Sequence, residues 1–415
     1  MDYKTLARAV AQHAALRRRQ VLQPVGGKGD KIFPPTYPPS DEAKRANRNA
    51  PPRHVYERRR LNGSEAWCVL VDSVQSQANR LEEALLATAR EKAISLPYVT
   101  VDFREAQLAG LTEITSLDAP HRVYDAILRD SLLGKDSFMK SALGIRLAEA
   151  KASDASVLLE TSPTALLFGA WHSTGEGGGL GAKFPRCLVS EIVAVNVPVE
   201  EGPADSRTGE VEIRTSGRRT GSRIDPLGVL RRVEVFKAPD GRWDVDKERA
   251  GRGAKAVRPS EINHGNIAPT VQPLGVTCDH AEHTAVLSFA GLRRLGFGGA
   301  PKDEAGRTLL AALGLVALAE QDARGYALRS RCDLVCDGRA PFELVHADGK
   351  VDRLEIGREA ARAVYGEAHK AAAKAGFEFP SEPIRLTPQD KLVEIVRRSQ
   401  QLALGGEGGE AEGEE

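Results

Sequence analysis

Hydrogen-bonding side chains are concentrated where an expected buried strand runs into a polar helix start, within residues 70–82. The neutral donors and acceptors and the one forked cation there are Ser73, Gln75, Gln77, Asn79 and Arg80. A strand-to-helix turn also exposes free backbone N–H groups, which suit phosphate. These residue types predict contact with a polyanion. Equally, Ser73 would serve as a simple helix cap, with Gln77 and Asn79 facing water.

Four further strings of unusual sequence lie along the chain: Arg17 to Arg19 followed by Leu22 to Pro24, Gly26 to Tyr37, Ala170 to Thr174, and Pro259 to Ile267. Together with residues 70–82, they resemble the Csb family. This family comprises the backbone RAMP subunits of type I-U (also called I-G) CRISPR surveillance complexes. Their order along the chain follows that of the family, so the resemblance extends over most of the sequence.

The resemblance implies a role in antiviral defence. Each copy of such a subunit grips a short segment of guide RNA (crRNA) and docks on the next copy, while a projecting hairpin interrupts the exposed bases. The expected partners are crRNA, further copies of the chain, other subunits of the effector complex and, through the guide, one strand of target DNA. The resemblance implies no catalysis and no cofactor. Base pairing would supply specificity, and the protein would supply electrostatics, spacing and assembly.

Positive charge is unevenly distributed, although the formal net charge is only +1. Residues 1–60 hold 14 Lys or Arg against 5 Asp or Glu, and residues 214–258 hold 13 against 6. The last eleven residues contain five Glu and no base. Two basic segments and an acidic tail, expected to be disordered, therefore lie within a nearly neutral chain.

Several basic and polar residues are candidates for RNA contact. Arg17, Arg18 and Arg19 lie in an expected strand, whose alternation would place at least one guanidinium on an open sheet face, and glycine around Lys28 and Lys31 allows close approach to phosphate. Solvation of a charged surface would explain the same residues. The other candidates are His172, Ser173, Thr174, Lys183 and Arg186 around a glycine-rich run, Arg218, Arg219 and Arg223 in a basic connection, and more weakly Lys255 and Arg258.

Aromatic residues make up only 5% of the chain, and the basic segments lack the aromatic pairs on which ordinary RRM domains stack bases. Recognition is therefore expected to rely on RNA backbone and shape, as suits a protein that must accept any guide sequence. Tyr37 and Trp171 are possible stacking exceptions.

Three other functions compete with this interpretation. Asp30, in the glycine-rich loop, resembles the loop aspartate with which related type III backbone subunits cut RNA, but it has no second acidic partner close in sequence. A generic single-strand binding protein is the second alternative. A zinc site is the third, and its potential ligands are Cys278, His280, His283, Cys332 and Cys336. Their spacing matches no familiar zinc motif.

Alternating strands and helices with long basic insertions predict an α+β fold, and the resemblance implies a modified RRM-like (ferredoxin-like) core. We expect a single elaborated domain over residues 1–404, with a basic loop insertion at 24–60, a helical insertion, a protruding hairpin at 205–258 and the tail at 405–415. Two segments, Glu210 to Arg214 and Arg231 to Phe236, are expected as the hairpin arms. The five scattered cysteines and the lack of a long apolar run lead us to expect a soluble cytoplasmic protein.

Overall fold

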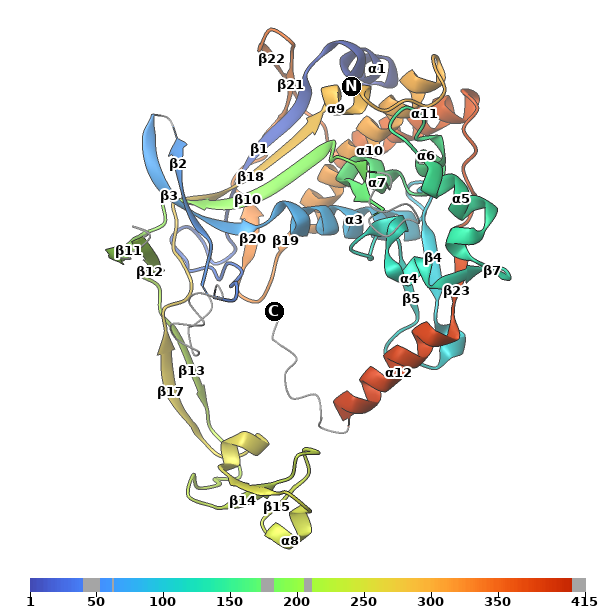
Figure 1. Ribbon diagram of the computed structural model, residues 1–415. Coiled ribbons are helices and arrows are strands. Elements are labelled where there is room, and N and C mark those ends of the chain that lie inside the picture. The colour runs from blue at the N-terminus through green and yellow to red at the C-terminus, as the bar shows by residue number, and fades with distance from the viewer. Residues whose placement is uncertain (40–52, 62, 173–182, 205–210, 405–415) are drawn as a thin grey trace. The chain divides into compact units, whose positions relative to one another are not determined.

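The computed structural model describes residues 1–39, 53–61, 63–172, 183–204 and 211–404 (Figure 1). The chain is an α+β protein that divides into two compact units. Unit 1 contains residues 1–34, 56–197 and 278–392, and unit 2 contains residues 35–55, 198–277 and 393–415.

Unit 1 is built on a nine-stranded sheet. Seven strands follow one another in the order β19-β20-β1-β18-β10-β3-β2, and a β21–β22 hairpin also pairs with β1. The strands are β1 (Ala15–Pro24), β2 (Tyr56–Leu61), β3 (Ser64–Asp72), β10 (Leu188–Val195), β18 (His280–Ser288), β19 (Tyr326–Ala327), β20 (Asp333–Cys336), β21 (Phe342–Val345) and β22 (Val351–Leu354).

The two faces of this sheet differ in burial. In β1, Leu16 and Leu22 are buried while Arg17 and Arg19 alternate with them on the more exposed face. Helices α3 (Val74–Arg90) and α10 (Lys302–Arg324) run along the covered face (Figure 1). The sequence therefore correctly predicts both the alternation of β1 and the open sheet face beside it.

A smaller five-stranded sheet completes unit 1, in the order β5-β4-β23-β6-β7. Its strands are β4 (Val99–Asp102), β5 (Glu113–Thr115), β6 (Ser131–Leu133), β7 (Asp136–Ser137) and β23 (Ile384–Pro388). The other elements of this unit are α1 (Tyr3–Gln12), η1 (Arg104–Ala106), η2 (Arg122–Tyr124), α4 (Ala126–Arg129), η3 (Phe138–Lys140), α5 (Ala142–Glu149), α6 (Ser156–Thr161), α7 (Pro163–Phe168), β8 (Ala170–Trp171), β9 (Lys183–Phe184), α9 (Phe289–Arg293) and α11 (Arg358–Lys374).

Unit 2 contains an extended two-stranded ribbon, β13 (Arg219–Arg223) paired with β17 (Ile267–Gln272), which leads to a small three-stranded sheet (Figure 1). That sheet has the order β15-β14-β16. The remaining elements here are β11 (Val199–Ala204), β12 (Val211–Thr215), β14 (Val235–Lys237), β15 (Trp243–Asp244), α8 (Lys247–Ala250), β16 (Lys255–Val257) and η4 (Pro259–Ile262). The last helix, α12 (Asp390–Leu404), begins in unit 1 and continues into unit 2.

The predicted arms of the hairpin are wrong. Residues 211–215 pair with β11, residues 235–237 pair with β15 and β16, and the long ribbon is formed by β13 and β17 instead. The hydrophobic pattern of a five-residue strand is too short to identify its partner strand. The partner of β13 is β17, which follows the small three-stranded sheet in the sequence.

Residues 122–130 do not form one continuous helix. Arg122 has a left-handed backbone conformation, with φ +55°, and Asp125 stands in extended conformation as the N-cap of α4. The segment therefore breaks into η2 and α4. Among the described helices, none is both long enough and apolar enough to cross a bilayer.

Candidate nucleic-acid interface

The polar helix start at residues 73–80 divides into exposed and buried side chains. The Ser73 hydroxyl caps α3 by accepting the Ser76 N–H at 3.2 Å. Gln75 and Asn79 are exposed, whereas Gln77 is fully buried. Only part of this segment is therefore accessible to a ligand.

A buried carboxylate explains why so many polar groups meet at this turn. Asp72, the last residue of β3, is 0% exposed and accepts hydrogen bonds from Ser76, Gln77, Arg80 and Arg329. The Arg80 Nε and Gln77 Nε2 atoms lie 2.9 and 2.6 Å from the Asp72 carboxylate. Arg80 is therefore held mainly by the protein itself, and we call this group the Asp72 knot.

Gln77 also connects the Asp72 knot to a second buried polar chain beneath the main sheet. The Ser190 hydroxyl lies 2.9 Å from Gln77 Oε1 and 2.6 Å from His283 Nε2. The other ring nitrogen of His283 lies 3.1 Å from the Tyr326 hydroxyl. Complete burial lowers the pKa of His283 to about 3, so the ring is neutral at ordinary pH.

Arg18 lies at the other end of this series of buried hydrogen bonds. Its guanidinium makes a bidentate ion pair with Asp322, which also accepts the Tyr326 O–H at 2.6 Å. The Arg18 side chain is 0% exposed. We therefore leave Arg18 and Gln77 out of the candidate interface, because burial gives both a structural role in linking β1, β3, β10, β18, α3 and α10.

The open face of the main sheet carries matched charges. Arg17 Nε lies 2.6 Å from Glu343, and Arg19 NH2 lies 2.7 Å from Glu282. Both arginines remain about half exposed, at 41% and 56% of the side chain. The charge of each guanidinium is therefore already balanced by its own carboxylate partner.

The glycine-rich loop after β1 forms compact turns. Gly27 and Gly29 have φ of +102° and +86°, and Asp30 accepts the backbone N–H of Lys31 at 2.8 Å. Lys28 Nζ lies 2.7 Å from the Asp337 carboxylate, and both side chains are partly exposed. The loop therefore places Lys28 at the surface and leaves Lys31 partly exposed.

A second exposed group lies at the start of the other glycine-rich run. Trp171 is 50% exposed and has Lys183 Nζ 5.6 Å from its ring centroid. His172 is buried and stacks on Tyr124, with centroids 5.0 Å apart. Burial, with Arg129 nearby, lowers the pKa of His172, so it is poorly suited to bind phosphate as a cation. Ser173 and Thr174 lie outside the described residues.

The backbone at Gly169 fixes the position of this group. Arg122 donates to the Gly169 carbonyl at 2.8 Å and forms a buried ion pair with Glu82 on α3. A Cβ at Gly169 would lie 3.0 Å from Arg186 Cγ, so the Arg186 side chain runs along this glycine. Trp171, Lys183 and Arg186 thus share one corner of unit 1.

The three basic residues predicted as RNA contacts in unit 2 differ in their contacts with the rest of the protein. Arg218 pairs with Glu200 at 3.2 Å, and Arg223 donates to the Asn263 carbonyl. Arg219 is exposed and forms no ion pair with the described residues. Tyr37, also in unit 2, is 38% exposed and exchanges backbone hydrogen bonds with Arg53.

Several carboxylates of unit 2 accept hydrogen bonds from backbone amides. Asp225 accepts the N–H groups of Gly265 and Leu227, Asp246 caps α8, and Glu261 accepts the Arg258 N–H at 3.0 Å. As a result, many exposed cations of this unit form no ion pair with the described residues. They are Arg219, Arg231, Arg232, Lys247, Arg249, Arg252, Lys255 and Arg258.

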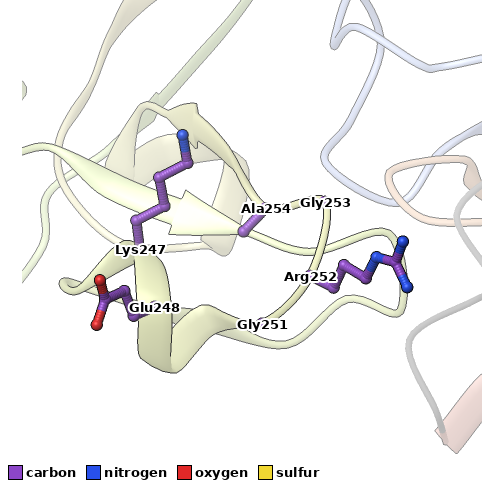
Figure 2. A pocket seen from close by; sticks show the side chains of 6 residues that line it. All are labelled: Lys247, Glu248, Gly251, Arg252, Gly253 and Ala254. Carbon is purple, nitrogen blue, oxygen red and sulfur yellow. The ribbon is translucent and has the colours of Figure 1, made fainter.

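An open hollow of about 500 Å³ lies beside α8 in unit 2 (Figure 2). Its lining includes Lys247, Glu248 and Arg252, whose side chains point in three different directions in Figure 2. A ligand site needs polar groups that converge. We therefore interpret these residues as part of the basic surface and not as a small-molecule pocket.

The potential zinc ligands are not gathered into one site among the described residues, which contain no group of three or more metal-binding side chains. Both ring nitrogens of His283 contact Tyr326 and Ser190. Burial raises the pKa of the Cys278 and Cys332 thiols to about 11, which disfavours the thiolate form that binds metal.

A comparison with known protein families finds a match for part of the chain. Residues 16–199 match the sequence model of a family described as CRISPR-associated protein GSU0053. This segment of the chain is therefore similar to that CRISPR-associated family. The match covers a little under half of the 415 residues, from β1 through the glycine-rich loop, Asp72 and Trp171 to the start of β11. The search of curated proteins finds no match.

Sequence reasoning missed two features of the interface. It did not single out Asp72 as the centre of the strand-to-helix turn, although an acidic residue ending a buried strand beside Arg80 is a usable signal. It also missed Phe33, whose ring has Arg331 4.4 Å and Lys31 5.7 Å from its centroid. Phe33 and Arg331 are almost 300 residues apart, so no local pattern could join them.

Proposed function

We propose that this CRISPR-associated chain is a guide-RNA-binding backbone subunit of a type I effector complex. In this role several copies bind along one crRNA in the cytoplasm and hold it ready to pair with target DNA, and the chain itself cuts neither strand. The family match supports a role in CRISPR defence. The backbone role, the subtype and the partners rest on the sequence resemblance and on the charge distribution.

The observation that carries the proposal is the set of eight exposed cations in unit 2 without ion pairs to the described residues. They follow an extended ribbon and the small sheet attached to it (Figure 1). Unneutralised Lys and Arg attract phosphate without reading base sequence. Guide RNAs of different sequence require binding of this kind.

The salt dependence of RNA affinity tests the proposal. We expect fluorescence anisotropy to give similar dissociation constants for unstructured RNAs of unrelated sequence, and affinity that falls steeply as salt rises. The double variant Arg231→Gln/Arg232→Gln is expected to reduce the slope of log affinity against log salt by about 0.7 per lost phosphate contact. Arg104→Gln is the matched control, because Arg104 is exposed but paired with Asp102.

Salt dependence, RNA length and the number of chains bound per RNA together distinguish the competing functions. A shallow salt slope, or strong preference for one sequence, would argue against backbone binding. Shortening of the RNA in the presence of Mg²⁺ that is abolished by Asp30→Asn would instead indicate the metal-dependent ribonuclease. Tight binding of one chain per RNA without assembly would favour the generic single-strand binding protein.

A further inference from the structure

A short two-stranded ribbon in unit 1 presents an aromatic ring and a cation on the same side. β8 and β9 pair antiparallel, with Trp171 opposite Lys183 and Ala170 opposite Phe184. Residues directly opposite each other in such a pair point to one face, and their neighbours in sequence point to the other face. Phe184 is buried, whereas Trp171 and Lys183 are exposed. The face with Phe184 therefore packs inward, and the face with Trp171 and Lys183 is turned toward solvent.

Both residues that flank β8 are held by buried contacts. Before the strand, the Gly169 carbonyl accepts a hydrogen bond from Arg122 at 2.8 Å, and Arg122 also donates to both carboxylate oxygens of Glu82 at 2.8 and 2.7 Å. After the strand, the His172 ring stacks on Tyr124, with an angle of 15° between the ring planes. The indole on β8 is therefore presented by a fixed backbone, so a ligand does not have to order this strand when it binds.

The exposed face of the ribbon combines an apolar ring with positive charge. Trp171 is 50% exposed, and Lys183 Nζ lies 5.6 Å from the centroid of its ring. Arg186, at the end of the same segment, is also exposed. An aromatic face beside cations favours a ligand that has both a flat π system and a negative charge, and the cations repel a positively charged ligand. A nucleotide meets both conditions, because its base can stack on the indole while its phosphate attracts the ammonium.

We propose that Trp171 and Lys183 form a subsite for one nucleotide of single-stranded RNA, with the base stacked on the indole and the phosphate held by the ammonium. This inference rests on the proposed RNA-binding function and adds a base contact to it. The contact does not read sequence, because every base has a π face. Phosphate contacts elsewhere position the strand, and this subsite fixes where one base lies along it.

The test uses a ligand from which the bases are removed while the phosphates remain. A short unstructured RNA and an abasic oligomer of the same length are compared by fluorescence anisotropy over a range of salt concentrations. The variants are Trp171→Ala, Trp171→Phe and Lys183→Gln, and thermal unfolding of each is followed by circular dichroism. Lys4→Gln is the matched control, because it removes an exposed lysine of α1, away from the ribbon in sequence.

The two side chains should affect the two ligands differently. Trp171→Ala should lower affinity for the normal RNA by about fivefold or more and leave affinity for the abasic oligomer unchanged, while Trp171→Phe should keep most of the affinity for both. Lys183→Gln should weaken binding of both ligands and lower the salt slope by about 0.7 for each. Lys4→Gln should leave both affinities unchanged.

Tryptophan fluorescence reports on the stacked base directly. The chain has three tryptophans, so the double variant Trp67→Phe/Trp243→Phe leaves Trp171 as the only one. A base that stacks on an indole quenches its emission. Normal RNA should therefore quench Trp171 at saturation, and the abasic oligomer should not.

Failure of the subsite and failure of the proposed function give different results. If the parent binds RNA but Trp171→Ala binds it equally well, or loses affinity for the normal and abasic ligands alike, the base contact is wrong while the proposed function stands. An unchanged salt slope in Lys183→Gln would overturn the phosphate contact. If the parent binds neither ligand at any salt concentration, the proposed function itself fails.

Discussion

Replacing Asp72 with alanine is expected to destabilise unit 1 strongly. Asp72 is fully buried and accepts hydrogen bonds from Ser76, Gln77, Arg80 and Arg329. Removing one partner of a buried ion pair typically costs about 3–5 kcal/mol, because the other charge remains without compensation. The two guanidinium groups are 24% and 21% exposed and retain some water, so we expect the lower end, about 3 kcal/mol.

Urea unfolding followed by circular dichroism measures this loss. With a slope of about 3 kcal/mol per molar urea, the unfolding midpoint should fall by about 1 M. Asp348→Ala is the control, since Asp348 is exposed and pairs with the exposed Lys350, and such a pair contributes at most about 1 kcal/mol. Equal midpoints for the two variants would refute the conclusion that the Asp72 knot holds β3, α3 and the 328–332 turn together.

Three further predictions concern pH, stacking and the tail. His283 has a pKa of about 6.5 in the unfolded chain and about 3 in the folded chain, so acid favours unfolding. As the pH falls from 6.5 to 3, the free energy of unfolding should decrease by about 1.4 kcal/mol per pH unit. Urea titrations at several pH values should show that His283→Gln loses this dependence. Trp171→Ala should weaken binding of short RNA by about 1–3 kcal/mol in anisotropy titrations, and Trp171→Phe should retain most of the affinity; equal loss in both would exclude stacking. Truncation after Leu404 should leave the melting curve unchanged and raise nonspecific RNA affinity slightly, because five Glu are removed; lost solubility with unchanged affinity would assign the tail another role.

The sequence predicts those features that depend on local pattern. The alternation of β1, the cap of α3 at Ser73 and the glycine-rich turns around Lys28 are all visible in the order of residue types. The α+β class follows from the same patterns, whereas the RRM-like detail of the core stays a prediction.

Features that depend on distant partners could not be predicted in this way. Alternation identifies an exposed face around Arg17 and Arg19 but does not show that Glu343 and Glu282 neutralise it. Likewise, the polar segment after β3 indicates a special turn, yet only the three-dimensional contacts show that Asp72 directs much of it inward. Charge counting finds the basic segment of unit 2 but does not show that its carboxylates bind backbone amides.

The most direct test of the central claim is the composition of the particle that the chain forms in cells. The protein would be purified at low salt from cells that express a CRISPR array and its processing nuclease, and the length of bound RNA and the native mass would be measured on one sample. The account predicts RNA of guide length in a particle that contains several copies of the chain. A monomer free of nucleic acid under the same conditions would contradict it.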